Sequence, residues 1–241
     1  MKKKNQTVVF VMMTAVLFLS GCLYPDENRS QNQVPYEDQL EAVQEAVDQF
    51  QLEQDGILPI KTKEDDPDIY EKYPIDFSKI SPQYMEEPPG NAFESGGIYQ
   101  YVLVDVETDP TVKLIDLRIA EQIQSINIRL IAHKYPPFKE TLADNVYSID
   151  FKELGYKEEP HVTSPYSQKQ LPFVMSGDGT LYIDYAADLY AVLQETKEKL
   201  EPGEDIRSLL VKSSPFVPAY SVPYTVDDQG EPIFMNGRKS D

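Results

Sequence analysis

The spacing of hydrophobic residues predicts an amphipathic helix from Tyr36 to Gln54. Apolar positions recur there at steps of three and four, which is the spacing of one helix face, while acids and glutamines fill the other positions. Gly56 ends the pattern two residues later. The apolar face consists of Leu40, Val43, Val47 and Phe50. Burying these side chains contributes about 1.5 to 3 kcal/mol each, so the helix belongs to the folded body.

The clearest strand pattern runs from Ile98 to Val106. It is rich in β-branched and aromatic residues and apolar on both faces in its middle, which predicts a strand in the centre of a sheet. Between Ile57 and Gly97, short apolar pieces alternate with proline, acid and glycine. Because proline cannot donate a hydrogen bond to a sheet, this stretch predicts short edge strands and loops.

A second helix is predicted from Asp109 to Ala132. Asp109 is a suitable N-cap and Pro110 suits the first helical position. The β-branched content would also suit strands, but the three-four spacing over about twenty residues favours a helix that ends before Pro136. The apolar positions are Val112, Ile115, Ile119, Ile123, Ile126 and Leu130.

The second half of the chain predicts two hairpins and two helices. Leu171–Ser176 and Thr180–Tyr185 flank a Gly-Asp-Gly turn, a hairpin signal. A helix is expected over 186–200, with Leu189, Val192 and Leu193 buried, and a short helix over 205–211. The turn at 227–230 predicts another hairpin. The fold class is therefore α+β, a mostly antiparallel sheet with three to four helices.

The first 21 residues have the order of a secretory signal peptide. Three lysines at 2–4 precede the apolar run Val8–Leu19, which ends in the small residues Ser20 and Gly21. The run is twelve residues long, whereas a membrane-spanning helix needs roughly 20. We therefore expect this segment to be removed and not to stay as an anchor.

Leu19-Ser20-Gly21-Cys22 resembles the lipobox of bacterial lipoprotein precursors. The resemblance implies cleavage before Cys22, an S-diacylglyceryl group on its sulfur and an N-acyl chain such as palmitate on its amino group. It places the protein at the cell membrane, anchored by lipid on the extracytoplasmic face. An ordinary secretory peptide with an incidental cysteine, or an uncleaved anchor, is the alternative.

These observations divide the chain into a removed signal peptide (1–21), a lipidated N-terminus with a short flexible tether (22–35) and a body (36–241). We expect one α+β body, with a division into two subdomains near 133–145 as the alternative. Cys22 is the only cysteine, so the body must be stabilised without disulfides.

The charge of the chain excludes one class of partner. The formal net charge is −19, and removal of the three leader lysines lowers it to about −22. Nucleic-acid binding needs a basic face, so no nucleic acid is expected as a partner. For the same reason an anionic membrane surface is not expected as a partner of the body.

The sequence predicts no catalytic residue, no cofactor and no metal site. The two histidines, His133 and His161, have no ligand partner at zinc spacing, and His133 suits the dipole at a helix end. No serine-hydrolase motif is present, and Ser95-Gly96-Gly97 and 176–179 are expected to be turns. The acidic stretch Glu64–Asp68 could bind calcium, but its spacing is not that of an EF-hand and a solvated loop is favoured.

The sixteen tyrosines, with no tryptophan, are the remaining unusual feature. Tyrosines on loops favour recognition of sugars or peptides. Proline-rich loops also pack tyrosine rings for structural reasons, and this alternative stays open. The neighbouring pairs are Pro35-Tyr36, Tyr73-Pro74, Tyr135-Pro136, Pro165-Tyr166 and Pro223-Tyr224.

The tether, the Pro-Tyr-Glu-Asp opening of the first helix and the acidic body resemble the uncharacterised YphF-type lipoproteins of Bacillus and its relatives. The resemblance implies a Gram-positive cell and transfers no catalytic residue. We therefore expect a non-enzymatic binding or interaction module whose partner is an envelope protein or cell-wall component, besides the membrane lipid of its covalent anchor. A carboxylate-dependent cell-wall hydrolase and a solute-capture lipoprotein are the alternatives.

Overall fold

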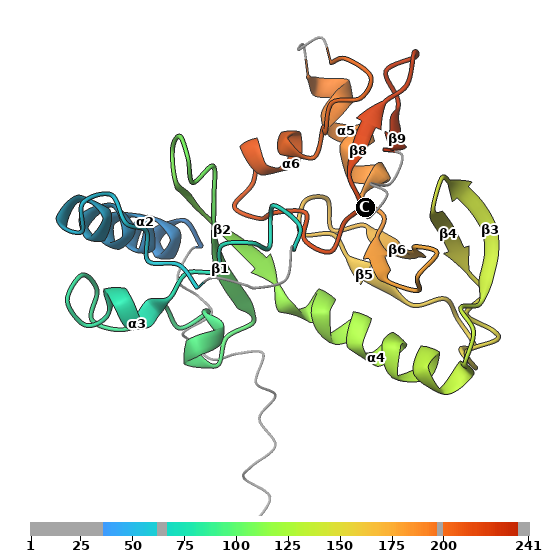
Figure 1. The fold of residues 1–241 in the computed structure, drawn as a ribbon, viewed down its shortest axis with the longest axis horizontal. Helices are drawn as coiled ribbons and strands as arrows, with labels where there is room; N and C mark the ends of the chain where they lie inside the picture. The colour runs from blue at the N-terminus through green and yellow to red at the C-terminus, as the bar shows by residue number, and fades with distance from the viewer. Residues whose placement is uncertain (1–35, 62–66, 197–199, 236–241) are drawn as a thin grey trace, which may run out of the picture. The chain divides into compact units, whose positions relative to one another are not determined.

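The computed structural model describes residues 36–61, 67–196 and 200–235. Their fold is α+β with antiparallel strand pairs, which confirms the predicted class (Figure 1). The predicted signal peptide and tether, and the polar tail 236–241, lie outside these residues. Within them, no helix combines the length and the apolar character that crossing a bilayer would require.

The N-terminal part of the body is built on a hairpin. Strands β1 (Tyr99–Val104) and β2 (Thr111–Asp116) pair antiparallel from Tyr99 opposite Asp116 to Val104 opposite Thr111. The other edge of β1 is also bonded, because Ile75 N donates to Tyr101 O at 3.0 Å and Leu103 N to Tyr73 O at 2.9 Å. The predicted strand therefore lies between two neighbours.

Helix α2 (Tyr36–Glu53) confirms the first predicted helix. Val43, Val47 and Phe50 are buried on its inner face, and Leu40 is half-buried against the same cluster. In its described residues, the stretch predicted as edge strands and loops contains the isolated bridge of Ile60 with Ile75, and Pro74 and Ala92 form isolated bridges to Val102 and Tyr99. It also contains α3 (Phe77–Ile80) and the 3-10 turn η3 (Phe93–Ser95). The helix α3 was not predicted.

The prediction of one helix from 109 to 132 is wrong in its first part. Residues 111–116 form β2, and α4 starts only at Leu117 and runs to His133. The strand is favoured because its backbone forms hydrogen bonds with the edge of β1 and because its side chains Val112 and Leu114 become buried. Asp116, not Asp109, caps the helix: its carboxylate accepts a hydrogen bond from Arg118 N at 3.0 Å.

The C-terminal part contains a second sheet. Strands β3 (Phe138–Ala143), β4 (Val146–Ile149), β6 (Gln170–Met175) and β5 (His161–Thr163) follow one another in that order, and β7 (Leu181–Ile183) pairs with β6. The β6–β7 pair is the hairpin predicted around Gly177-Asp178-Gly179. The second predicted hairpin is β8 (Tyr224–Val226) with β9 (Pro232–Phe234).

Two further helices accompany this sheet. Helix α5 (Ala186–Glu195) ends earlier than predicted, because the backbone of Thr196 is extended. Leu189 is fully buried as expected, whereas Val192 and Leu193 are half-buried. Helix α6 (Ser208–Lys212) corresponds to the short helix predicted over 205–211.

The buried apolar residues form three clusters. One lies under α2 and the β1–β2 hairpin, and a second lies among α4, α5 and the second sheet. A third joins Val102, Val104 and Ile115 to Val211 and Val217. Backbone hydrogen bonds also connect β2 to this C-terminal segment, since Leu114 N donates to Pro215 O at 2.9 Å. A division into two subdomains near 133–145 stays a prediction.

Candidate functional site

The residues that the sequence singled out do not come together in one site. Cys22 and residues 64–66 of the acidic stretch lie outside the described residues. His133 lies in the last turn of α4, where its Nδ1 is 2.9 Å from Tyr135 O, and His161 is exposed on β5. Among the described residues, no group of three or more histidine, cysteine or acidic side chains is arranged to hold a metal ion.

The motif Ser176-Gly177-Asp178-Gly179 is a turn, as expected. The Ser176 hydroxyl and the backbone N–H of Thr180 both donate to Oδ1 of Asp178. These bonds favour the charged carboxylate and lower the pKa of Asp178. Asp178 therefore holds the turn between β6 and β7.

Within the described residues, five of the chain's sixteen tyrosines are packed inside the body. Tyr70, Tyr99, Tyr101, Tyr185 and Tyr224 are buried, the last two completely. The Tyr224 hydroxyl donates to Asp184 Oδ1 at 2.7 Å and that of Tyr185 to Ala219 O at 3.2 Å. Of the described tyrosines that neighbour proline, Tyr135 is largely exposed, so its ring is available on the surface.

One buried carboxylate is held by serine hydroxyls. Asp188 of α5 is 1% exposed and accepts hydrogen bonds from Ser164 Oγ at 2.7 Å and Ser167 Oγ at 2.5 Å. Ser164 Oγ in turn accepts from the backbone N–H of Tyr166 and Ser167, both at 3.0 Å. This network fastens the loop between β5 and β6 to the first turn of α5, which is a structural task.

A buried arginine forms a second polar cluster. Arg207 donates from Nη1 to Ser221 O at 3.1 Å, and its Nη2 lies 2.8 Å from Asp205 Oδ2. Its guanidinium also lies 5.1 Å from the ring centre of Tyr70. Burial lowers the pKa of Arg207, but the carboxylates of Asp205 and Asp68 more than offset this, so the arginine stays charged. No pattern in the sequence predicts this cluster, because Asp68 and Tyr70 lie far from Arg207 in the chain.

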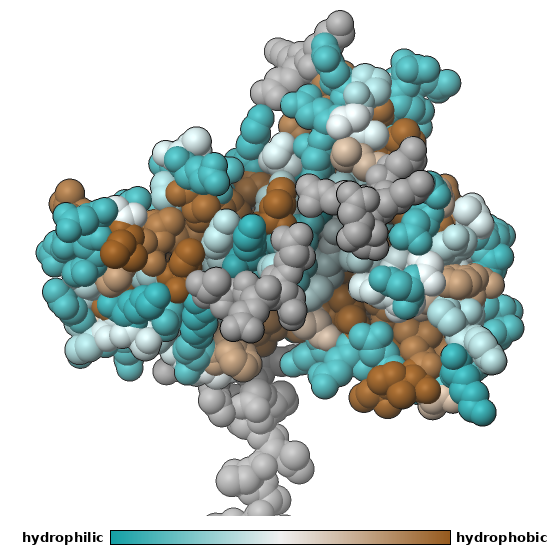
Figure 2. Space-filling view, in the orientation of Figure 1, coloured by the Kyte–Doolittle hydropathy of each residue, from teal (hydrophilic) through white to brown (hydrophobic). Residues whose placement is uncertain are grey.

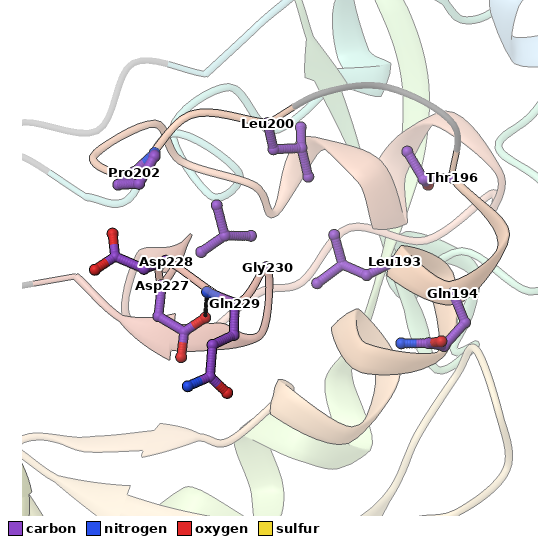
Figure 3. A pocket seen from close by; sticks show the side chains of 10 residues that line it. Leu193, Gln194, Thr196, Leu200, Pro202, Asp227, Asp228, Gln229 and Gly230 are labelled. Carbon is purple, nitrogen blue, oxygen red and sulfur yellow. Dashed lines mark hydrogen bonds between the residues drawn. The ribbon is translucent and has the colours of Figure 1, made fainter.

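The best candidate for a ligand site is a surface hollow of about 430 Å³ between the end of α5 and the turn of the β8–β9 hairpin (Figure 3). We call it the hairpin hollow. Leu193, Leu200 and Val226 line its apolar side, and Figure 3 shows the first two pointing toward the same space. A polar rim is formed by Gln194, Thr196, Asp227, Asp228 and Gln229.

The two acids of the rim have different tasks. Asp227 Oδ1 accepts from the backbone N–H groups of Gln229 at 2.8 Å and Glu231 at 2.9 Å, so this carboxylate holds the turn. Asp228 is exposed beside it. An apolar group next to a positively charged or N–H donor group matches this combination of surfaces. The sequence predicted the turn but not the hollow, which requires the packing of α5 against a distant hairpin.

Comparison with known families identifies the N-terminal part of the body. Residues 36–116 match the sequence model of the YphF family N-terminal domain. This segment runs from the first residue of α2 to the last residue of β2. No curated protein and no solved structure matches the chain. The match supports the YphF-type resemblance for this segment and assigns no activity.

Proposed function

We propose that this protein is a lipid-anchored module that binds a protein or peptide of the cell envelope on the outer face of a bacterial membrane, without catalysing a reaction. The anchor is supported by the leader, in which lysines, a twelve-residue apolar run and Leu19-Ser20-Gly21-Cys22 occur in the order of a lipoprotein precursor. Two or three acyl chains on Cys22 would hold the body stably, where one chain binds only reversibly.

The binding role is supported by the hairpin hollow. Its apolar side chains and the exposed carboxylate of Asp228 suit a peptide segment that carries an apolar side chain beside a lysine, arginine or free amide. The volume lies within the range of about 300 to 1,000 Å³ that is usual for ligand pockets. The position at the tip of a hairpin leaves room for a ligand that belongs to a larger molecule.

The anchor is tested by the Cys22→Ala variant with Ser20→Ala as the matched control. Cells are fed a labelled fatty acid, and the protein is followed by detergent phase separation. We expect label on the wild type and on the control, and an unlabelled, uncleaved precursor for Cys22→Ala. Lipid label on Cys22→Ala would contradict the assignment.

The binding role is tested by crosslinking in the intact envelope. Asp228→Lys reverses the exposed charge of the hollow without touching the core, and Asp144→Lys makes the same change at an exposed position elsewhere. We expect the wild type and Asp144→Lys to recover the same envelope protein, and Asp228→Lys to recover about tenfold less, equivalent to about 1.4 kcal/mol. Equal recovery by both variants excludes the hollow as the binding site. Cleavage of wall material that is lost in Asp228→Lys would instead support the hydrolase.

A further inference from the structure

The second half of α4 and the connection to β3 expose an unusual number of apolar side chains. Ile128 is 64% exposed, Ile131 82%, Tyr135 77% and Phe138 42%. Ile128 and Ile131 lie about one turn apart on the same helix face. Figure 2 shows hydrophobic residues gathered over this half of α4. We call these four residues the α4 surface.

The helix is held so that these side chains face outward. Ile119 and Ile126 of α4 are buried in the core with the second sheet. Arg129 fixes the helix from the side, because its Nη1 donates to Leu154 O at 3.1 Å and its guanidinium lies 4.1 Å from the ring centre of Tyr156. The exposed isoleucines are therefore on the outer face of a firmly packed helix.

The α4 surface also differs from the rest of the chain in charge. No acidic residue occurs between Glu121 and Glu140, whereas Arg129, Lys134 and Lys139 do. All three basic residues are exposed. Two acids from elsewhere in the chain lie beside this segment, both with exposed side chains: Glu159 is 3.6 Å from Lys139, and Glu153 is 3.9 Å from His133. Water weakens exposed pairs of this kind. In a chain with a net charge of −19, this is a place that an anionic surface can approach without strong repulsion.

The length of chain between Cys22 and the first helix limits how far the body can turn relative to the membrane. Thirteen residues, from Leu23 to Pro35, separate Cys22 from the first helix, and fully extended they span at most about 45 Å. A compact body of this size has a radius of gyration of about 17 Å. A chain longer than this radius permits more than one face to rest on the membrane, so the chemistry of the surface selects among them.

We propose that the anchored body rests on the lipid bilayer through the α4 surface, with Ile128 and Ile131 in the interface and Tyr135 and Lys134 at the headgroups. Exposed aliphatic side chains beside aromatic and basic ones are typical of contacts with the membrane interface. This inference rests on the proposed anchor and restricts one expectation from the sequence: the net charge keeps most of the body off the membrane, but not this surface.

The contact between the α4 surface and the bilayer sets the orientation of the body, whereas the covalent lipid attaches the protein to the membrane. A few apolar side chains and about 1 kcal/mol for each basic residue near an anionic surface give a weak bond. The covalent lipid supplies the high local concentration that makes such a weak bond effective. The hairpin hollow, on another part of the body, stays available to its ligand.

The test uses the absence of tryptophan in the chain. The full-length lipidated protein carrying Ile131→Trp is purified and reconstituted in vesicles of phosphatidylglycerol and phosphatidylethanolamine, with bromine on the acyl chains as a quencher. The matched control is Leu52→Trp, because Leu52 is 84% exposed next to Glu53 and near Asp55. We expect blue-shifted emission and roughly threefold stronger quenching for Ile131→Trp than for the control.

A second variant tests the charge. Adding Lys134→Glu to Ile131→Trp should weaken the quenching in phosphatidylglycerol vesicles and leave it nearly unchanged in neutral phosphatidylcholine vesicles. Equal quenching of Ile131→Trp and Leu52→Trp, in protein that floats with the vesicles, overturns the proposal and leaves the α4 surface to a protein partner. Protein that does not float with the vesicles contradicts the anchor itself, so the two failures can be told apart.

Discussion

Arg207 Nη2 lies 2.9 Å from Asp68 Oδ2, and this contact joins the segment between α2 and β1 to the C-terminal part of the body. The arginine side chain is 2% exposed, whereas those of Asp68 and Asp205 are 23% and 28% exposed. A buried cation of this kind is stable only with its carboxylate partners in place, because the guanidinium has lost its water.

The Arg207→Met variant should therefore lose about 3 to 5 kcal/mol of unfolding free energy, since it keeps most of the side-chain volume but leaves both carboxylates without their partner. Urea denaturation followed by circular dichroism measures the loss. Lys61→Met is the control, because the pair of Lys61 with Glu94 at 3.4 Å is solvent-exposed and should cost less than about 1 kcal/mol. Similar losses for the two variants would mean that Arg207 does not hold the segments together.

The buried tyrosines predict a loss of stability at alkaline pH. Burial raises the pKa of Tyr101 and of Tyr220 to about 12 in the folded protein, and Tyr166, Tyr185 and Tyr224 are shifted upward for the same reason. In the unfolded chain they titrate near pH 10. Between these values the folded state binds more protons, so the unfolding free energy falls as the pH rises, by up to about 1.4 kcal/mol per pH unit for each tyrosine.

The measurement is a titration followed by tyrosinate absorbance and by circular dichroism. The tyrosines whose pKa is raised by burial should ionise only when the protein unfolds, above about pH 10. If all sixteen tyrosines ionise without loss of structure, the tyrosines named above are not sealed in the core.

Two glycines should respond differently to alanine. A Cβ on Gly97 would lie 2.1 Å from the backbone carbon of Asn91, and backbone cannot move aside cheaply. On Gly177 it would lie 2.6 Å from Asn145 Oδ1, a side chain that can rotate at the loss of its bond to Gly177 N. We expect Gly97→Ala to cost more than about 3 kcal/mol and Gly177→Ala about 1 to 2 kcal/mol, measured by thermal and urea unfolding. The reverse order would refute this reading of the two contacts.

The sequence was informative where local chemistry decides the structure. The turn at Gly177-Asp178-Gly179 fixes the β6–β7 hairpin through bonds within five residues, so its pattern could be recognised. Helix α2 was also predicted, because one face of it meets the core along its whole length. In both cases short-range signals and tertiary packing agree.

The sequence pattern was misleading where pairing between strands decides the secondary structure. Val112, Ile115 and Ile119 have helical spacing, yet the first two lie on β2, because β1 offers a strand edge nearby. The signal that could have corrected this is Asp116, an N-cap residue directly before an apolar stretch of helical period. The hairpin hollow and the Arg207 cluster depend on contacts between distant segments, for which a single sequence carries no pattern.

No loop separates β2 from α4, since the strand ends at Asp116 and the helix begins at Leu117. The segment that matches the family model ends at the same residue. Helix α4 has 17 residues, so it is a rod of about 25 Å. A displacement of about 2 Å at its far tip turns the rod by about 5° at its base. A force on Ile128 or Ile131 is therefore shared between the core contacts of Ile119 and Ile126 and the junction with β2, where the carboxylate of Asp116 caps the helix.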